Sequence, residues 1–168
     1  MAESSHQYVE RILSYVDGAN PLEVLAATPP RLTVLIAGVD DARLSRRPAP
    51  DKWSPQEIVA HLADTELVLG YRVRQILQTS GIAIQAFDQD QWAVIGQYQR
   101  IPAARSVERL RLEREANLEL LRSLTPAQRV QHGVHAERGK ETIERIQLLW
   151  AGHDINHCRQ VQRILNPA

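Results

Sequence analysis

The sequence predicts an all-α protein in which four long helices form a bundle, with shorter helices between them. Apolar residues recur at three- and four-residue spacing in four segments, at about 30–47, 54–78, 106–123 and 141–165. Proline, glycine and serine residues separate these segments, and no stretch alternates convincingly between apolar and polar residues, so strand should be negligible. Helices that must bury their apolar faces against one another form a bundle.

The composition predicts one domain. The chain has 168 residues, enough to bury a full core, and we expect a single domain over residues 1–168 with its bundle at about 21–165. Lys and Arg number 20, and so do Asp and Glu, so the formal net charge is zero. Nucleic-acid-binding proteins normally carry a basic excess, so we expect no nucleic-acid partner.

The sequence also predicts a cytoplasmic protein. Its one cysteine cannot form an intramolecular disulfide, which argues against an oxidised extracellular scaffold. The first residues are polar and lack the apolar centre of a signal peptide. No apolar run approaches the length that spans a bilayer, so we expect no membrane association.

Helix start signals divide the first half of the chain. Residues 1–20 should form an extension with one short amphipathic helix, and Asn20 followed by Pro21 should begin a second short segment that ends near residue 27. Thr28 and the two prolines after it predict the start of the first long helix. Ser54, Pro55 and Glu57 predict a capped helix with a first-turn proline, which runs to about residue 78.

The second half should contain a short helix at 92–98 and two more long helices. Ser106 is expected to cap the third long helix, and Thr125 followed by Pro126 should add one further turn. Residues 130–140 show neither helical nor alternating periodicity, so they are expected to be a connection. The last helix should begin near Glu141 and end before Pro167.

The last helix carries the first candidate site, since His153 and His157 lie one turn apart on the same face. They lie on or beside an apolar stripe made of Ile143, Ile146, Trp150, Val161 and Ile164. Two inward imidazoles at this spacing form half of a transition-metal site before any ion arrives. The alternative is that each is a hydrogen-bonded core residue.

His61 is the third inward histidine, between Ile58 and Leu62 on the second long helix. Burying three imidazoles without partners costs on the order of 1–3 kcal/mol each, and a shared divalent ion would remove that cost. Three histidine ligands leave a coordination position open, as in catalytic sites. The outer ring nitrogens would need acceptors, and Glu57, Asp64, Asp154 and Gln160 are near in sequence.

The sequence resembles the DinB/YfiT-like superfamily at two motifs, over about residues 21–165. One is Trp-Ser-x-x-Glu-x-x-x-His-Leu within 52–66, and the other is His-x-x-x-His-x-x-Gln at 153–160. The resemblance implies a four-helix bundle in up-down-down-up order, often a homodimer, with nickel, zinc or another divalent ion on three histidines. By position these ligands are His61, His153 and His157.

The resemblance implies two kinds of enzyme that act on a small-molecule substrate. A thiol-dependent S-transferase, which we favour, would bind a low-molecular-weight thiol cosubstrate at the open position, where its pKa falls. Arg72 and Arg74 could bind that thiol. A metal-dependent hydrolase would hold an activated water there. In either enzyme Glu57 would be the proton acceptor, with Asp154 the weaker candidate.

A third interpretation is a non-catalytic stress or binding protein whose metal only ties two helices together. Cys158 is rotated about 100° from His157 on the helix, so we expect it to pack rather than react. The other three histidines have no ligand spacing and are expected on the surface or in loops: His6, His132 and His135. Aromatic residues at 92–98 form a candidate dimer contact.

Overall fold

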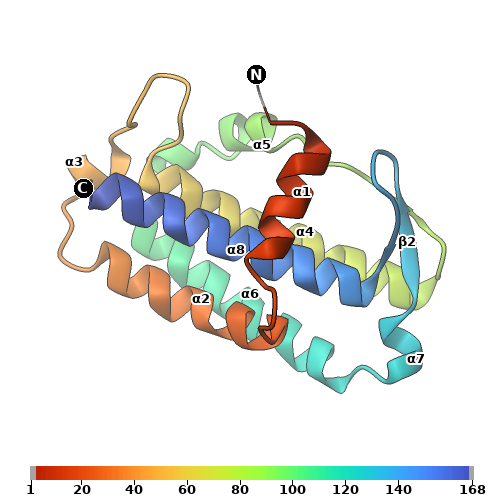
Figure 1. Ribbon diagram of the computed structural model, residues 1–168. Coiled ribbons are helices and arrows are strands. Elements are labelled where there is room, and N and C mark those ends of the chain that lie inside the picture. Colours follow the sequence, from red (N-terminus) through yellow and green to blue (C-terminus); the bar gives the residue numbers. More distant parts are fainter. Residues whose placement is uncertain (1–2, 167–168) are drawn as a thin grey trace.

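Four long helices lie side by side along the length of the protein (Figure 1). The computed structural model describes residues 3–166. Its helices are α1 (Ser5–Ser14), α2 (Pro21–Ile36), α3 (Asp41–Ser45), α4 (Pro55–Gln78), α5 (Gln89–Ile95), α6 (Ala103–Ser123), α7 (Pro126–Arg129) and α8 (Ile143–Leu165), with a 3-10 turn η1 at Tyr98–Arg100.

The four bundle helices are α2, α4, α6 and α8, and they run in up-down-down-up order. In Figure 1, α2 and α8 run in one direction and α4 and α6 in the other. Each packs against two neighbours, so that α4 and α6 are parallel neighbours and α2 lies between α6 and α8. The predicted all-α bundle is therefore confirmed.

The first bundle helix differs from the prediction. The expected break before residue 30 and the expected helix to residue 47 were wrong, because α2 runs unbroken from Pro21 through Pro29 and Pro30 to Ile36. A proline inside a helix leaves the carbonyl four residues earlier without its amide donor. For Pro29 that carbonyl belongs to Leu25, and it accepts a hydrogen bond of 2.5 Å from Arg114 Nη1 on α6.

Other helix boundaries lie close to the prediction. Ser54 and Glu57 form the predicted capping box of α4, with Pro55 as its first residue. The third bundle helix begins at Ala103, so Ser106 lies within it rather than at its cap. The last begins at Ile143, where the Thr142 hydroxyl accepts from the Arg145 amide as an N-cap.

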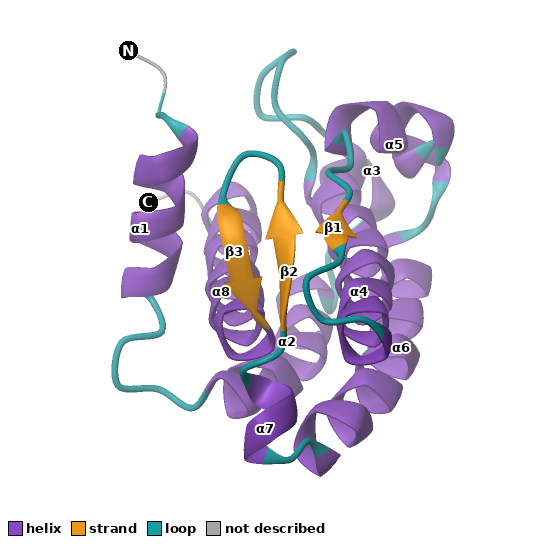
Figure 2. Ribbon diagram, turned by 90° about the vertical axis from the view of Figure 1, so that its right-hand side faces the viewer, coloured by secondary structure: helices purple, strands orange, loops and turns teal. Residues whose placement is uncertain are grey.

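A small three-stranded sheet lies where only a connection was expected. Its strands are β1 (Ala83–Ile84), β2 (His132–His135) and β3 (Gly139–Thr142); β1 is parallel to β2, which is antiparallel to β3. Figure 2 shows them side by side across one end of the bundle. A glycine occupies a buried position of β2, where a Cβ would come within 2.5 Å of the Ile84 side chain. Strands with so few apolar side chains lack the alternation by which a strand is predicted.

The core of the bundle has two apolar halves. One centres on Trp150, Leu25 and Ile76, and the other on Leu32, Ile58 and Val161. Each bundle helix passes from one half to the other across a layer of buried polar side chains, including those of Thr28, Glu66, Arg114 and Asp154. Within residues 3–166, no helix is long and apolar enough to span a membrane.

The short N-terminal helix α1 packs across α8 at a glycine. A Cβ built on Gly152 would lie 2.2 Å from the backbone oxygen of Ile12, so only glycine permits this approach. Arg11 adds a hydrogen bond of 2.7 Å from its Nη1 to Oδ1 of Asn156. These contacts place α1 beside the histidines of α8.

Candidate metal centre

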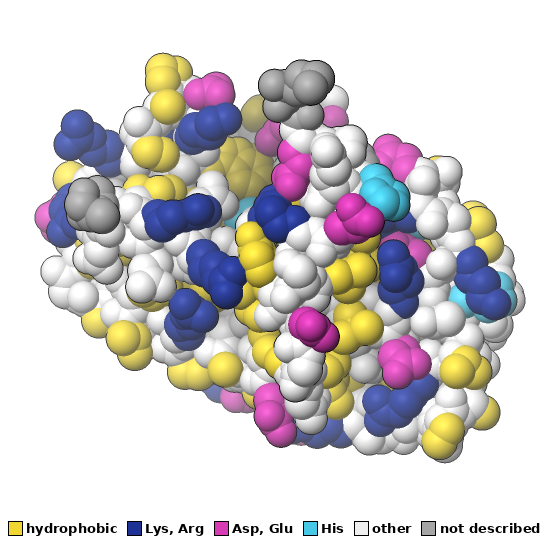
Figure 3. All heavy atoms as spheres, viewed as in Figure 1, with side chains coloured by type: hydrophobic (Ala, Val, Ile, Leu, Met, Phe, Trp, Pro, Cys, Tyr) yellow, Lys and Arg dark blue, Asp and Glu magenta, His cyan; other side chains and the backbone are white. Residues whose placement is uncertain are grey.

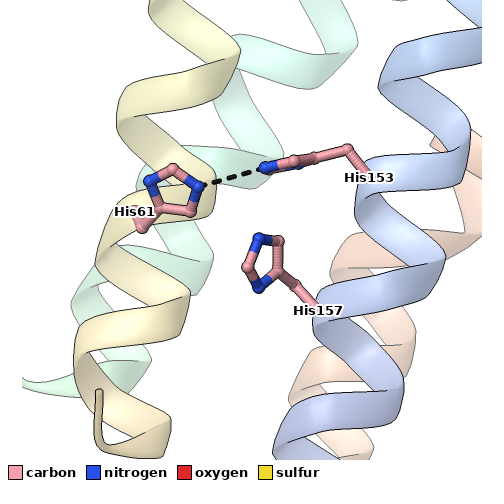
Figure 4. Close-up of side chains that lie close together, drawn as sticks. All are labelled: His61, His153 and His157. Carbon is pink, nitrogen blue, oxygen red and sulfur yellow. Dashed lines mark hydrogen bonds between the residues drawn. The ribbon is translucent and has the colours of Figure 1, made fainter. Parts of the chain in front are cut away.

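The structure brings the three predicted histidines together. His61 projects from α4, and His153 and His157 from α8, so that the rings face one another across the space between two antiparallel helices (Figure 4). One ring nitrogen of each histidine lies within 4.8 Å of the corresponding nitrogens of the other two. The one-turn spacing on α8 and the antiparallel packing of α4 produce this convergence.

Two of the inner nitrogens are spaced as ligands of one ion would be. His61 Nε2 and His153 Nε2 lie 3.1 Å apart. Two nitrogens at about 2.0–2.1 Å from a common ion lie about 2.9 Å apart at a right angle and about 3.4 Å apart at a tetrahedral angle. The separation of this pair falls between these limits, so His61 and His153 fit as ligands of one divalent ion, and the three nitrogens together lie within 4.8 Å of one another.

The outer nitrogens differ in their partners. His157 Nδ1 lies 3.0 Å from Oε1 of Gln160, and because that oxygen can only accept, the proton of this ring belongs on Nδ1. The Nε2 lone pair of His157 is thereby left for a ligand bond. This confirms the expected role of Gln160. Within residues 3–166, Nδ1 of His61 and Nδ1 of His153 have no hydrogen-bond partner.

Burial keeps two of these rings neutral. It lowers the pKa of His61 well below the usual value, and the neighbouring His157 and His153 rings add to that shift. Burial is also the main reason that the pKa of His157 falls to about 3, against the opposing effect of its contact with Gln160. Neutral imidazoles are the form that binds metal, so at neutral pH no proton competes with an ion at His61 or His157.

A buried ionic network lies next to the histidine cluster and includes Asp154, which follows His153 in the sequence. Arg114 of α6, 2 % exposed, donates at 2.8 Å from Nη1 to Oδ2 of Asp154, which is 0 % exposed. Arg114 also pairs with Glu66 of α4, donating at 2.7 Å from Nε to Oε2. Asn117 completes the contact with Glu66, donating 2.8 Å from Nδ2 to Oε1. Asp154, next to His153 in sequence, therefore faces the network.

A cavity of about 610 Å³ opens on the three histidines. Its walls come from α1, α4, α8, the loop at 86–89 and the hairpin of β2 and β3, and apolar side chains such as Phe87, Leu69 and Trp150 line much of it. The space-filling view shows the surface hollowed beside α1, with hydrophobic side chains at the visible opening (Figure 3). The loop with Phe87 and Asp88 thus forms part of the cavity.

Of the two arginines proposed as thiol contacts, only Arg72 reaches the cavity. It lines the wall together with Arg138 of the hairpin. Arg74 instead donates at 2.9 Å from Nη1 to the backbone oxygen of Gly70 and at 2.7 Å to Oδ1 of Asn117.

Glu57, the predicted proton acceptor, is not among the residues that line this cavity. Its carboxylate accepts from Arg47 Nε at 2.9 Å, and from the Ser54 amide and hydroxyl, also at 2.9 Å. The structure thus places Glu57 at the helix start as a cap. Asp64 is likewise engaged, by Tyr98 and Arg109.

The remaining cysteine and histidine residues differ in their burial and in the elements that carry them. Cys158 is buried, and burial raises the pKa of its thiol to about 12, so it is a packing residue as expected. His6 is exposed, and His132 is the first residue of β2, the middle strand of the sheet. His135 was expected in a loop, but it is a buried strand residue that lines the cavity.

Two features of the site were not predicted from the sequence: the buried Arg114, and the part that α1 takes in the cavity wall. Arg114 falls at an inward position of the α6 stripe, between Leu110 and Leu118, and a charge at such a position signals a buried partner. Tyr8, Val9 and Ile12 line the cavity, although their helix was expected to be only an extension. Their pattern predicts a helix that packs, and nothing in it indicates which face of the bundle it covers.

The fold and the three-histidine cluster define a four-helix-bundle protein with a candidate metal centre. A family model described as the DinB superfamily matches residues 25–161. The chain therefore belongs to the DinB superfamily, as its two motifs predicted.

Two curated proteins and one solved structure are similar to the chain. A protein of Oceanobacillus iheyensis named "Putative metal-dependent hydrolase" is 24% identical over 164 residues, covering 98% of this chain and 87% of its own. A protein of Halalkalibacterium halodurans with the same name is 22% identical over 144 residues, covering 86% and 84%. The structure of YfiT from Bacillus subtilis, titled "a probable metal-dependent hydrolase with an unusual four-helix bundle topology", superposes with a TM-score of 0.81 at 21% identity, covering 97% of this chain and 88% of that one.

Proposed function

We propose that the chain is a divalent-metal-dependent enzyme whose ion is held by His61, His153 and His157. The convergence of three inward ring nitrogens is the observation that carries this proposal. Nickel and zinc are the ions that we expect, because both suit imidazole ligands. The names of the two relatives support a metal-dependent activity in this superfamily.

When bound, such an ion offers an open position to a thiol or a water and lowers the pKa of that group. The side chains of the cavity wall, such as Phe87, Leu69 and Trp150, would orient the partner molecule. Asp64 and Glu57 are bound by other side chains, and Asp154, whose Oδ2 accepts from Arg114, does not line the cavity, so none of the three is a ready base there. A thiol, with its ordinary pKa of about 8.5, needs much less help to ionise than water does.

Thiol-dependent transfer is therefore the first candidate reaction. Arg72 and Arg138 in the cavity wall support it, because biological low-molecular-weight thiols carry carboxylates that arginine binds. In the transfer the thiolate sulfur forms a bond to an electrophilic carbon, and the leaving group departs with the electron pair of the bond that breaks.

Metal-dependent hydrolysis is the second candidate, and the names of the two relatives favour it. Water would then add to a carbonyl carbon in place of the thiol, and the leaving group would depart with a proton. A cavity carboxylate would have to accept the proton from that water, and Glu137 of the hairpin is a candidate.

One pair of assays separates these reactions. The protein, loaded with nickel or zinc, would be given 1-chloro-2,4-dinitrobenzene with 3-mercaptopropionate, and separately p-nitrophenyl acetate without thiol. We expect release of chloride in the thiol assay to be metal-dependent and lost in His157→Ala. Metal-dependent ester hydrolysis without thiol turnover would favour the second candidate. Stoichiometric metal with neither activity would favour a binding protein.

We also propose a homodimer. The aromatic residues expected to make this contact are not exposed, since Tyr98 is buried and Trp92 is half-buried, but the neighbouring Val94 and Ile95 of α5 are exposed and support a contact there. Light scattering at micromolar concentration tests this, and a monomer mass would contradict it.

A further inference from the structure

Arg72 is a buried guanidinium without a carboxylate partner. The residue is 7 % exposed, and within residues 3–166 no carboxylate lies within ion-pair distance of it. Its Nη2 donates at 2.6 Å to the backbone oxygen of Gln85, while its Nε has no acceptor. Leaving a buried charge unpaired is costly, so a partner from outside the chain is implied.

The carboxylates around Arg72 are exposed or bound by another side chain. Glu141 is a nearby buried carboxylate. Its two oxygens accept hydrogen bonds from Nε and Nη2 of Arg138, at 2.6 Å and 3.0 Å. Glu137 also lines the cavity but is exposed, and His135 is held neutral by burial and by Arg138, which lower its pKa. Glu137 and Arg138 are both exposed, so Arg72 and Glu141 are the buried charges of this group, and the Glu141 carboxylate is bound by Arg138 rather than by Arg72.

Arg72 and the histidine cluster are parts of the same cavity wall. His61, Thr65, Leu69 and Arg72 follow at three- and four-residue steps along α4, and all four line the cavity. Arg72 lies about 16 Å along the axis from His61, but helical side chains lean toward the N-terminus, which brings the guanidinium back toward the rings. The Phe87 ring lies between them, with its centroid 5.9 Å from Arg72 Cζ and 6.4 Å from the His61 ring centroid.

We propose that Arg72 binds the carboxylate of a small molecule that lies against Phe87 and Leu69 and extends toward the histidine cluster. A planar guanidinium edge matches a carboxylate, and the single charge of Arg72 matches a monoanion better than a phosphate dianion. The arrangement selects an elongated molecule with its anionic group at one end and its reactive group at the other. That its reactive end is transformed at the histidines rests on the proposed function; the binding of the carboxylate does not.

The competing role for Arg72 is to anchor the loop after β1 through the backbone oxygen of Gln85. Arg72→Gln keeps a hydrogen-bond donor for that oxygen but removes the charge, whereas Arg72→Lys keeps a charge. Arg74→Gln is the matched control, because Arg74 lies on the same helix and also bonds a backbone oxygen, yet does not line the cavity.

Pentanoate and its uncharged analogue pentanamide are suitable probes, titrated into the full-length protein as purified and followed by NMR chemical shifts. A charged hydrogen bond in a buried site predicts that pentanoate binds about tenfold more tightly than pentanamide. We expect Arg72→Gln to remove most of this preference, Arg72→Lys to keep part of it, and Arg74→Gln to leave it unchanged. The same preference should persist in His153→Ala, which separates this site from the metal chemistry.

Three results would overturn the assignment. One is equal binding of pentanoate and pentanamide by the wild-type protein, or no saturable binding of either. Another is an undiminished preference in Arg72→Gln, which would place the carboxylate elsewhere. The third is tighter binding of butyl phosphate than of pentanoate, which would contradict the class of anion.

Discussion

The Nε2 atoms of His61 and His153 lie 3.1 Å apart, although 92 residues separate them in the chain. Two ring nitrogens can approach so closely when one donates to the other or when an ion lies between them. A single hydrogen bond between two rings does not explain the third ring, whose Nε2 is left free by Gln160. The proposed ion, shared by three rings, would account for all three orientations.

Gln160 should tune the affinity for metal without holding the ion itself. Gln160→Ala removes the acceptor that fixes the tautomer and orientation of the His157 ring. We expect metal affinity to fall about 10- to 100-fold, as is typical when such a partner of a ligand histidine is lost. Competition with a chromophoric chelator measures it. Gln162→Ala, on the exposed side of α8, is the control, and an equal loss there would contradict the argument.

Gly152 should be required for the docking of α1. In Gly152→Ala the new methyl group meets the backbone of Ile12, so α1 must move away. We expect a loss of about 1–3 kcal/mol in the free energy of unfolding, as for overpacked sites. Hydrogen exchange should rise in α1 and stay unchanged in α6. Stability equal to that of wild type, with normal protection of α1, would show that the contact is not tight.

The buried network should matter far more than a similar network on the surface. Arg114→Met leaves Glu66 and Asp154 buried without their cation, which predicts a loss of about 3–5 kcal/mol in the free energy of unfolding. Arg111→Met is the matched control, since Arg111 also lies on α6 and bonds two glutamates, but in solvent. Its effect on urea unfolding should be much smaller. Equal losses would mean that burial does not strengthen the pairing.

Glu57 should act as a helix cap whose effect depends on pH. Burial alone would raise the pKa of Glu57, but Arg47 and Ser54 outweigh it and hold the pKa below its usual value. Its stabilisation is therefore present above the ordinary carboxyl pKa and is lost as the pH falls through the lowered one. We expect Glu57→Gln to cost about 1–2 kcal/mol at neutral pH and less near pH 3, by urea unfolding.

The matched control for Glu57 is Glu119→Gln, an exposed position on α6. This substitution should change the free energy of unfolding very little at both pH values. A loss of turnover in Glu57→Gln at unchanged stability and metal content would restore the catalytic role that the sequence indicated for this residue.

The capping signals and the inward histidines were visible in the sequence because each is a local pattern. Ser54, Pro55 and Glu57 predict the start of α4 from four consecutive positions. His153 and His157 share a face because of helix geometry alone. The course of α2 through Pro29 was not visible, because Arg114, 85 residues later, supplies the missing donor. The sheet was not predicted for the same kind of reason, since β1 and β2 pair although α5, α6 and α7 lie between them in the sequence.

Metal analysis of the purified protein tests the central claim most directly. The account predicts one divalent ion per chain, lost in the His61→Ala, His153→Ala double variant while the helical spectrum is kept by the two apolar halves of the core. His135→Ala, which alters a histidine of the same cavity outside the cluster, should keep the ion. Unchanged metal content in the double variant would contradict the account, because the ligands would then lie elsewhere.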